Sequence, residues 1–299
     1  VTPEGRISPC DLGLWADEQM DAWRWIVADA KAAGATMAVQ LNHAGRKAST
    51  GCFSIGYEHE SVPEEQGGWQ TVGPSANAFG PLDKPRELTV DEIHAIVDQF
   101  RDAAWRAYDI GFDAVEIHAA HGYLLSQFLD PLINEREDEY GGSFDNRIRI
   151  LVEVVDAVRS VIPDTMPVLV RVSATDWAAG GWDLDQTVDL AKVLKKHGVD
   201  LMDVSTGGMI PGVTIPVKPD YQVPFAEQVR SRAEIPTTAV GLITKPKQAK
   251  KILKSGAADA IEIGRAALRD PNWPLRAAHK LGIPTEDAPY QPQYVRGAY

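Results

Sequence analysis

The order of predicted strands and helices is the feature that most constrains the fold of this 299-residue chain. Short apolar runs rich in Val, Ile and Leu alternate with longer segments of helical periodicity. The predicted strands are 37–41, 114–117, 168–172, 201–204, 238–240 and 260–263. The predicted helices are 17–33, 90–110, 147–161, 184–197, 224–233 and 245–255. Repeated β then α order predicts parallel strands with right-handed helical crossovers, as in a (β/α)8 TIM barrel or a doubly wound sheet.

Residues 49–88 interrupt this rhythm with a long stretch rich in Gly, Pro, Ser and acids. Helical and strand patterns resume on both sides of it. A long loop in a compact domain is more often a functional cover than a linker, although a plain surface insertion is the alternative. We therefore predict one domain, 1–299, with an excursion at about 49–88.

The charge balance bounds the partners of the chain. Its 30 Lys and Arg against 42 Asp and Glu give a net charge of −12, which argues against sequence-independent binding of nucleic acid or of an anionic membrane. No apolar run approaches the roughly 20 residues that span a bilayer, and the first residues lack the pattern of a secretory signal. We expect a soluble, cytoplasmic protein with neither nucleic-acid nor membrane partners.

The two cysteines, Cys10 and Cys52, are too few and too far apart in sequence to predict a disulfide framework. They are also too few to build an iron–sulfur or zinc site. The default expectation is a reducing compartment.

Polar clusters follow the ends of the predicted strands, which is the pattern expected of a shared active-site rim in a parallel barrel. The clusters contain Gln40, His118 with His121 and Tyr123, Arg171, Ser205, Gly241, and Gly264 with Arg265. The His-x-x-His spacing is a weak metal motif, because no Glu follows the first histidine as in zinc proteases, and we expect no metal. The two imidazoles and the phenol instead suit polarisation of a carbonyl and supply of a proton. Histidines that are simply hydrogen-bonded in the packing are the alternative.

Two predicted strands near the C-terminus end in glycine, and the second glycine is followed by arginine. Gly241 and Gly264 let backbone N–H groups approach an anion, and Arg265 offers a planar fork for phosphate. Barrels commonly place a phosphate site after their last two strands. We therefore predict a phosphate-binding site from these three residues.

Arg171 lies inside an apolar strand and needs an anionic or hydrogen-bonding partner. Asp203 and Glu116, also within strands, are candidate partners in the core. Alternatively, Arg171 faces the electron-rich edge of a cofactor. Gln40 offers an amide to the rim of a heterocycle, or is an ordinary buried amide.

The sequence resembles the Old Yellow Enzymes, a family of flavin-dependent ene-reductases, and particularly the bacterial NADPH dehydrogenases of the thermophilic-like subclass. The resemblance extends over essentially the whole chain. It is carried by PEGRISPCDLGLW, VQLNHAGRKA, IHAAHGYLLSQFLDPLINEREDEYGGSFDNR, VRVSATDW, FAEQVR, GLIT, IGRAALRDP and QYVRGAY. The family resemblance implies a TIM barrel whose first two strands are absent from this chain.

The resemblance also implies that FMN is the cofactor and NADPH the reductant. Gln40 corresponds to the residue that binds the pyrimidine side of FMN, and Arg171 to the one that faces the N1/C2-oxygen edge. Gly264 and Arg265 correspond to the phosphate-binding pair.

The substrate-binding residues implied by the resemblance are His118 and His121, which would hydrogen-bond the substrate carbonyl. Tyr123 would protonate the α carbon after hydride reaches the β carbon of an activated alkene. Arg296 resembles the arginine that enters the site of a neighbouring subunit, which implies a homodimer or homotetramer.

Two other functions stay open on the sequence. One is a phosphate-binding TIM-barrel lyase or isomerase, which would use a catalytic lysine or a pair of carboxylates at the rim. The lysine close to a strand-end cluster is Lys47. The other is a truncated, non-catalytic flavin-binding relative.

Overall fold

A parallel six-stranded sheet forms the centre of the molecule in the computed structural model, which describes residues 1–52 and 60–299. In sheet order the strands are β1 (Ala38–Leu41), β4 (Ala114–Ala119), β5 (Val168–Ser173), β6 (Leu201–Ser205), β7 (Thr237–Ala239) and β8 (Ala260–Ile261). Every neighbouring pair is parallel. All six predicted strands are therefore present, in the order expected of consecutive β/α units.

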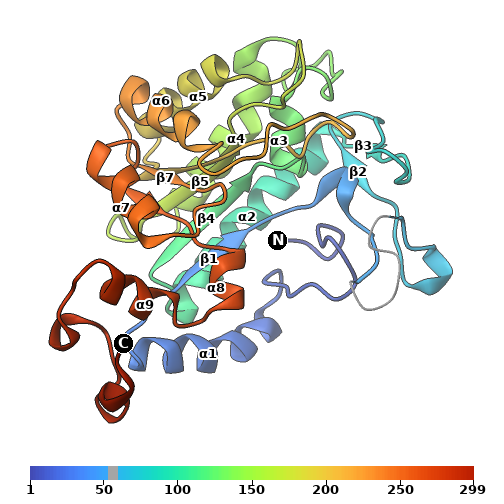
Figure 1. The fold of residues 1–299 in the computed structure, drawn as a ribbon. Coiled ribbons are helices and arrows are strands. Elements are labelled where there is room, and N and C mark those ends of the chain that lie inside the picture. The colour runs from blue at the N-terminus through green and yellow to red at the C-terminus, as the bar shows by residue number, and fades with distance from the viewer. Residues whose placement is uncertain (53–59) are drawn as a thin grey trace.

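Helices connect the strands and cover the sheet from outside (Figure 1). The predicted helices are α1 (Met20–Ala32), α2 (Val90–Ile110), α4 (Phe144–Arg159), α5 (Leu184–Lys196), α6 (Val223–Ala233) and α7 (Pro246–Ser255). Three further helices were not predicted: α3 (Leu124–Leu129), α8 (Arg265–Arg269) and α9 (Trp273–Lys280). All six residues of α3 are buried, so it lacks the polar face that reveals a surface helix in a sequence. The 3-10 turns are η1 (Asp17–Gln19), η2 (Gly45–Lys47), η3 (Glu64–Gln66), η4 (Thr285–Asp287) and η5 (Pro292–Gly297).

Alternation along the strands separates an apolar face from a polar one. On β4, Val115 and Ile117 are fully buried and belong to the main hydrophobic core, together with Phe100 of α2 and Leu151 of α4. The residues between them point to the opposite face, because successive side chains of a strand alternate. That opposite face is the interior of the barrel, and it carries the polar side chains of the site.

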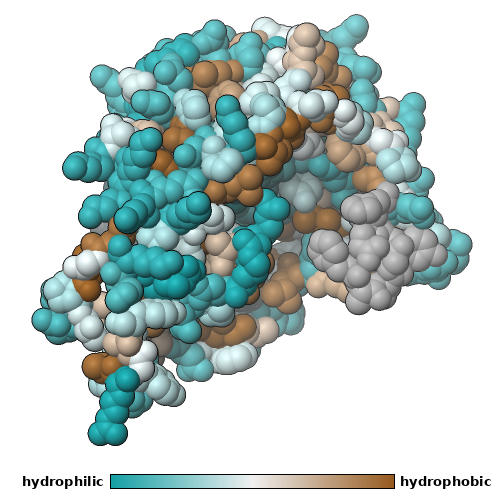
Figure 2. All heavy atoms as spheres, in the orientation of Figure 1, coloured by the Kyte–Doolittle hydropathy of each residue, from teal (hydrophilic) through white to brown (hydrophobic). Residues whose placement is uncertain are grey.

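The sheet ends at β1 on one side and at β8 on the other among the described residues. The N-terminal loop and α1 lie beside β1, and the C-terminal segment lies beside α8 and α9 (Figure 1). The side of the molecule that faces the viewer exposes both hydrophilic and hydrophobic residues, and hydrophobic ones lie beside the hollow near its middle (Figure 2).

The segment after β1 returns to the N-terminal loop and then to the rim. The backbone N–H and the hydroxyl of Thr50 both donate to the carbonyl of Ile7, each at 2.9 Å. Two short parallel strands follow, β2 (Val72–Gly73) and β3 (Arg86–Glu87). The buried Arg46 then joins distant loops, because its guanidinium donates to the carbonyl of Asn77 at 3.3 Å and of Met209 at 2.7 Å.

Cys10 and Cys52 form a disulfide, with their Cα atoms 5.9 Å apart. The prediction that the two cysteines are too few and too far apart in sequence for a disulfide framework missed this single bridge. Their sequence separation of 42 residues does not measure their distance, because the chain near Thr50 folds back onto the N-terminal loop. The bridge joins this loop to the start of the segment that follows β1.

Within the described residues, no helix has both the length and the apolar character needed to cross a membrane.

Candidate active site

The two predicted histidines lie against each other at the end of β4. Nε2 of His118 is 3.3 Å from Nδ1 of His121, and the ring of Tyr123 packs edge-on against His118 with centroids 5.0 Å apart. His121 has a φ of 58°, a left-handed conformation that few residues with a side chain adopt. This turn brings His121 back over the strand end, so the structure gathers His118, His121 and Tyr123 as the sequence predicted.

His121 is held from several directions. Its backbone N–H donates to Oγ of Ser173 at 2.9 Å, and its carbonyl accepts from Nζ of Lys47 at 2.8 Å. Its Nε2 lies 2.8 Å from Oγ of Ser205. Ser173 and Ser205 are register partners on β5 and β6, so the sheet itself sets the spacing of the two hydroxyls.

Burial keeps this cluster uncharged. Desolvation, followed by the nearby His121, lowers the pKa of His118 well below its usual value. Desolvation, followed by Arg171, lowers the pKa of His121 to about 3. The pKa of the Tyr123 phenol is raised, chiefly by burial. At neutral pH the cluster therefore offers neutral imidazoles and a protonated phenol, a set that can donate hydrogen bonds to an oxygen and a proton to carbon.

Lys47 is a site residue whose role the sequence did not reveal. Its ammonium donates to the carbonyls of His121 at 2.8 Å and Gly208 at 2.7 Å, and lies 4.0 Å from the ring centroid of Phe79. Desolvation, followed by Arg46, lowers the pKa of Lys47 to about 8. Lys47 therefore joins the loops after β4 and β6, which is a structural use rather than that of the free nucleophile a lyase requires.

A cavity of about 380 Å³ opens beside Tyr123. Its lining is mainly apolar and consists of Ile7, Lys47, Thr50, Phe79, Pro81, Leu82 and Tyr123. Small-molecule sites are typically concave and largely apolar, with a few polar groups that orient the ligand. The phenol of Tyr123 and the ammonium of Lys47 are such groups here.

Arg171 pairs with carboxylates inside the barrel. Its Nε lies 3.0 Å from Oδ2 of Asp203, and its Nη2 lies 3.1 Å from Oε2 of Glu262. Asp203 was a predicted partner, whereas Glu262 was missed. The sequence feature that could have revealed Glu262 is its position as a carboxylate in an otherwise apolar segment directly after β8. The side chain of Arg171 remains 23% exposed, so these ion pairs leave it accessible to a ligand.

Gln40 and Glu116 complete the polar group that Arg171, Asp203 and Glu262 form inside the barrel. Nε2 of Gln40 donates to Oε1 of Glu116 at 2.6 Å, so Glu116 bonds the amide instead of forming the predicted core pair with Arg171. Oxygens of Glu116, Asp203 and Glu262 lie within 4.8 Å of one another. Burial, followed by the negative charge of Glu262, raises the pKa of Asp203 to about 9, and burial raises the pKa of Glu116. Like charges brought together out of water favour retention of protons.

The three residues predicted to bind phosphate line one pocket. Gly241, Gly264 and Arg265 surround about 200 Å³ between the loops after β7 and β8, and Arg269 adds a second guanidinium to its lining. No atom lies within 4 Å of the position that a Cβ on Gly264 would take. The backbone there is open to a ligand, and the two cations suit an anionic one.

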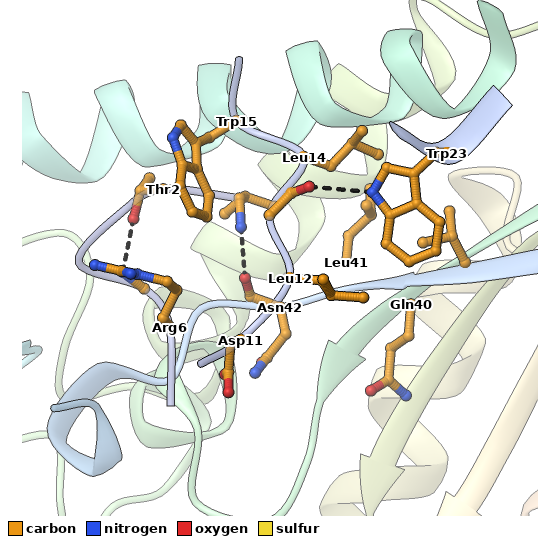
Figure 3. A pocket seen from close by; sticks show the side chains of 14 residues that line it. Thr2, Arg6, Asp11, Leu12, Leu14, Trp15, Trp23, Gln40, Leu41 and Asn42 are labelled. Carbon is orange, nitrogen blue, oxygen red and sulfur yellow. Dashed lines mark hydrogen bonds between the residues drawn. The ribbon is translucent and has the colours of Figure 1, made fainter. Parts of the chain in front are cut away.

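A third pocket lies between the N-terminal loop, α1 and β1 (Figure 3). It encloses about 210 Å³, and its wall includes Gln40, Asn42, Trp15 and Trp23. The side-chain oxygen of Asn42 is buried and has no hydrogen-bond partner among the described residues. Gln40 thus lies where the pocket meets the charged interior.

Arg296 lies in η5, in the C-terminal segment, and is exposed. It lines a separate hollow with Asn272, Tyr290 and Tyr299. It does not line the pockets described above at the strand ends of its own chain. Its predicted entry into the site of a neighbouring subunit stays a prediction.

A parallel α/β sheet, a neutral histidine pair and a glycine-lined anion pocket together are typical of a flavin-dependent α/β-barrel oxidoreductase. A sequence profile of the NADH:flavin oxidoreductase / NADH oxidase family matches residues 1–283, and the chain belongs to this family. The predicted family, and the assignment as a flavin-dependent oxidoreductase, are thereby confirmed.

Individual relatives agree with this assignment. The chain is 46% identical over 298 residues to an NADPH dehydrogenase of Geobacillus thermodenitrificans, covering 99% of this chain and 81% of that protein. It is 48% identical over 292 residues to an NADPH dehydrogenase of Listeria monocytogenes, covering 97% and 80%. The structure matches the old yellow enzyme homologue of Zymomonas mobilis with a TM-score of 0.76 at 30% identity, covering 93% and 77%. These likenesses confirm the predicted TIM-barrel fold class.

FMN is the cofactor of this family and NADPH the reductant of these relatives, as predicted. The residues present fit FMN. The open backbone at Gly264 beside Arg265 suits its phosphate, and the unpartnered oxygen of Asn42 marks a polar wall near Gln40.

Proposed function

We propose that this protein is an ene-reductase, which reduces the carbon–carbon double bond of a small α,β-unsaturated carbonyl compound or similar activated alkene with NADPH. The observation that carries the proposal is the neutral pair of His118 and His121 beside the protonated phenol of Tyr123. The chemistry that bound FMN supplies is acceptance of a hydride from NADPH and its delivery to the β carbon.

The histidines would stabilise the charge that develops during this reduction. Hydride arrival at the β carbon moves negative charge onto the carbonyl oxygen. Neutral donors held in a buried site stabilise such charge strongly, because little water competes with them. His118 and His121 are the donors we propose, and this role accounts for the need for an electron-withdrawing group on the alkene.

Tyr123 would then protonate the α carbon. Its pKa is raised, so the phenol keeps its proton at neutral pH. It borders the apolar cavity of about 380 Å³, which would hold the body of the alkene. The ring of Tyr123 packs against His118 and also borders the cavity, and these two contacts support the role.

The cofactor would be held at two places. Gly241, Gly264 and Arg265 would bind the phosphate, and Gln40 and Arg171 would bind the flavin ring. The glycine-lined pocket and the remaining exposure of Arg171 support these assignments.

We also propose that the protein works as a homodimer or homotetramer. Arg296 would reach the site of a neighbouring copy, and its exposed position near the C-terminus is compatible with this role.

The test is an absorbance spectrum of the purified protein, followed by anaerobic NADPH and then 2-cyclohexenone. Flavin bands that bleach with NADPH and recover with the enone are expected. Bleaching without recovery would contradict the ene-reductase proposal and leave a dehydrogenase with another electron acceptor. A folded protein that holds FMN and does not bleach would favour a non-catalytic flavin-binding relative, and a colourless active protein would favour a lyase or isomerase.

An Arg265→Gln variant tests the phosphate site separately. Loss of a charge-assisted contact to phosphate is expected to weaken FMN binding by about tenfold or more. Arg232→Gln, which removes an exposed guanidinium paired with Asp185, is the matched control. Equal FMN affinity in the two variants would contradict the assignment of Arg265.

A further inference from the structure

The protonation of the histidine pair follows from the hydrogen bonds around it. Nδ1 of His118 accepts from the backbone N–H of Ala120 at 3.1 Å. A backbone N–H can only donate, so Nδ1 of His118 carries no proton. Because the ring is neutral, its single proton is on Nε2.

This assignment fixes the direction of the next two bonds. Nε2–H of His118 points to Nδ1 of His121 at 3.3 Å, so Nδ1 accepts and the proton of the neutral His121 is on Nε2. Nε2–H of His121 then donates to Oγ of Ser205 at 2.8 Å. Each imidazole in the ligand-free chain therefore uses its proton inside the protein.

The chain of donors ends at a buried amide. The hydroxyl of Ser205 donates to Oε1 of Gln222 at 3.2 Å, and the hydroxyl of Thr206 donates to the same oxygen at 2.7 Å. An amide oxygen only accepts, so all bonds run from His118 towards Gln222. Gln222 is 3% exposed and Ser205 is 5% exposed, so water does not readily replace either partner.

A substrate carbonyl that receives both imidazole protons requires a different arrangement. His118 can already offer Nε2–H, but His121 can offer a proton on that side only from Nδ1. Nε2 of His121 must then become an acceptor. The hydroxyl of Ser205, at 2.8 Å, is the group placed to donate to it.

We propose that Ser205 is a positioning residue that sets the tautomer of His121, turning its hydroxyl from Gln222 to His121 when a carbonyl ligand binds. This inference rests on the proposed function. One proton leaves Nε2 of His121 and one arrives at Nδ1 by exchange with solvent water, so the charge of the ring is unchanged. Ser205 only rotates its O–H bond.

The surrounding contacts make this change inexpensive. When Ser205 turns, Oε1 of Gln222 keeps the shorter bond from Thr206. The longer bond from Ser205 is exchanged for one to Nε2 of His121. No buried donor or acceptor of the group is left without a partner, and an unpaired buried group is the main cost of changing such a network.

The direct test is the tautomer of His121 in the oxidised, FMN-loaded protein, measured by long-range ¹H–¹⁵N NMR on ¹⁵N-histidine-labelled material. We expect the proton on Nε2 without ligand and on Nδ1 with saturating 2-cyclohexenone. Binding of the enone without a change of tautomer would overturn the inference and leave the proposed function intact. An enone that perturbs neither the flavin spectrum nor any histidine would overturn both.

Two neighbouring hydroxyls provide matched variants. Ser205→Ala removes the hydroxyl that we propose sets the tautomer of His121. We expect loss of the ligand-dependent tautomer change and about tenfold weaker enone binding. Thr206→Val removes a hydroxyl bonded to the same Gln222 but not to His121, and should keep the tautomer change. Ser205→Thr retains the hydroxyl and should restore it. A tautomer change in Ser205→Ala like that of the wild type would overturn the inference.

Discussion

Two polar layers lie on the same three strands, two residues apart, and they differ in the charged groups that they contain. The histidine layer consists of His118, Ser173 and Ser205, and the acid layer consists of Glu116, Arg171 and Asp203. The histidine layer is neutral and joined by hydrogen bonds. The acid layer contains a guanidinium among several carboxylates, including Glu262 from beyond β8.

Burial acts on both layers in the same sense. Desolvation disfavours any charged form, so it lowers the pKa of His118 and raises that of Asp203. The histidines can satisfy each other as neutral groups. The carboxyl groups respond partly by keeping protons, and Arg171 is the counter-charge for those that ionise. The histidine layer is therefore suited to hydrogen-bond donation, while the acid layer sets the electrostatic field below the histidine layer.

The largest effect is expected from Arg171→Gln, which leaves buried carboxylates without their cation. Removing one partner of a buried ion pair costs about 3–5 kcal/mol. We expect a loss approaching this size in the free energy of unfolding at about pH 10, where Asp203 is ionised, and a smaller loss at about pH 7, where Asp203 keeps its proton. Urea unfolding at both pH values measures it.

The control for this variant is Arg24→Gln, whose ion pair with Asp109 is largely exposed. It should change stability by less than about 1 kcal/mol. A loss for Arg171→Gln that is equal at both pH values would show that the acids do not respond to the missing cation.

His118→Ala with His121→Ala should have the next largest effect. It removes both proposed donors to the carbonyl oxygen, and we expect affinity for a carbonyl ligand to fall by about a hundredfold. Titration of the FMN-loaded protein with p-hydroxybenzaldehyde, followed by the flavin spectrum, measures the change. His94→Ala, an exposed histidine on α2, should bind as the wild type does. Unchanged affinity in the double variant would remove the histidine layer from the substrate site.

Tyr123→Phe is expected to have a smaller, kinetic effect. It should slow reoxidation of the reduced enzyme by 2-cyclohexenone about tenfold, because water can partly replace a phenol as proton donor. Ligand affinity should stay close to that of the wild type, since the histidines are retained. Because the pKa of Tyr123 is raised, the wild-type rate should show no fall near the ordinary phenol pKa. Stopped-flow measurements across this pH range test both points.

The smallest effect at neutral pH is expected from Asp203→Asn, because the wild-type carboxyl is itself uncharged there, and the effect changes with pH. The folded pKa of about 9 lies above the ordinary value of 3.8, so the folded protein binds a proton that the unfolded chain has released between these pH values. Stability from this group is present at low pH and is lost as pH rises towards about 9. The Tm of the variant relative to that of the wild type should therefore rise steadily on going from about pH 5 to about pH 9, because only the wild type loses this proton-dependent stability. A constant difference would contradict a raised pKa for Asp203.

Much of the fold could be predicted because its information is local. The strands are short apolar runs buried on the core side, and helices such as α2 show a clear apolar face. α3 escaped prediction because it is buried all round, so it carries no periodic contrast. The His-x-x-His spacing also had local meaning, since a strand end followed by one tight turn brings two such side chains together.

Contacts between distant segments could not be predicted in the same way. Arg171 lies 91 residues from Glu262, and Lys47 lies 161 residues from Gly208. The disulfide between Cys10 and Cys52 depends on a return of the chain to the N-terminal loop. No spacing rule reports these partners, because they are set by which loops the barrel places side by side.

The sequence by itself determined the alternation of strands and helices, the polar strand ends, and the family to which the chain belongs. These follow from burial periodicity and from residues adjacent in the chain. Only the folded arrangement pairs Arg171 with Glu262, places Lys47 against the backbone carbonyl of His121, and brings His121 within 2.8 Å of Ser205. The physical reason is that the direction of a hydrogen bond and the pKa of a buried group depend on every neighbour in space, whereas periodicity depends only on neighbours in sequence.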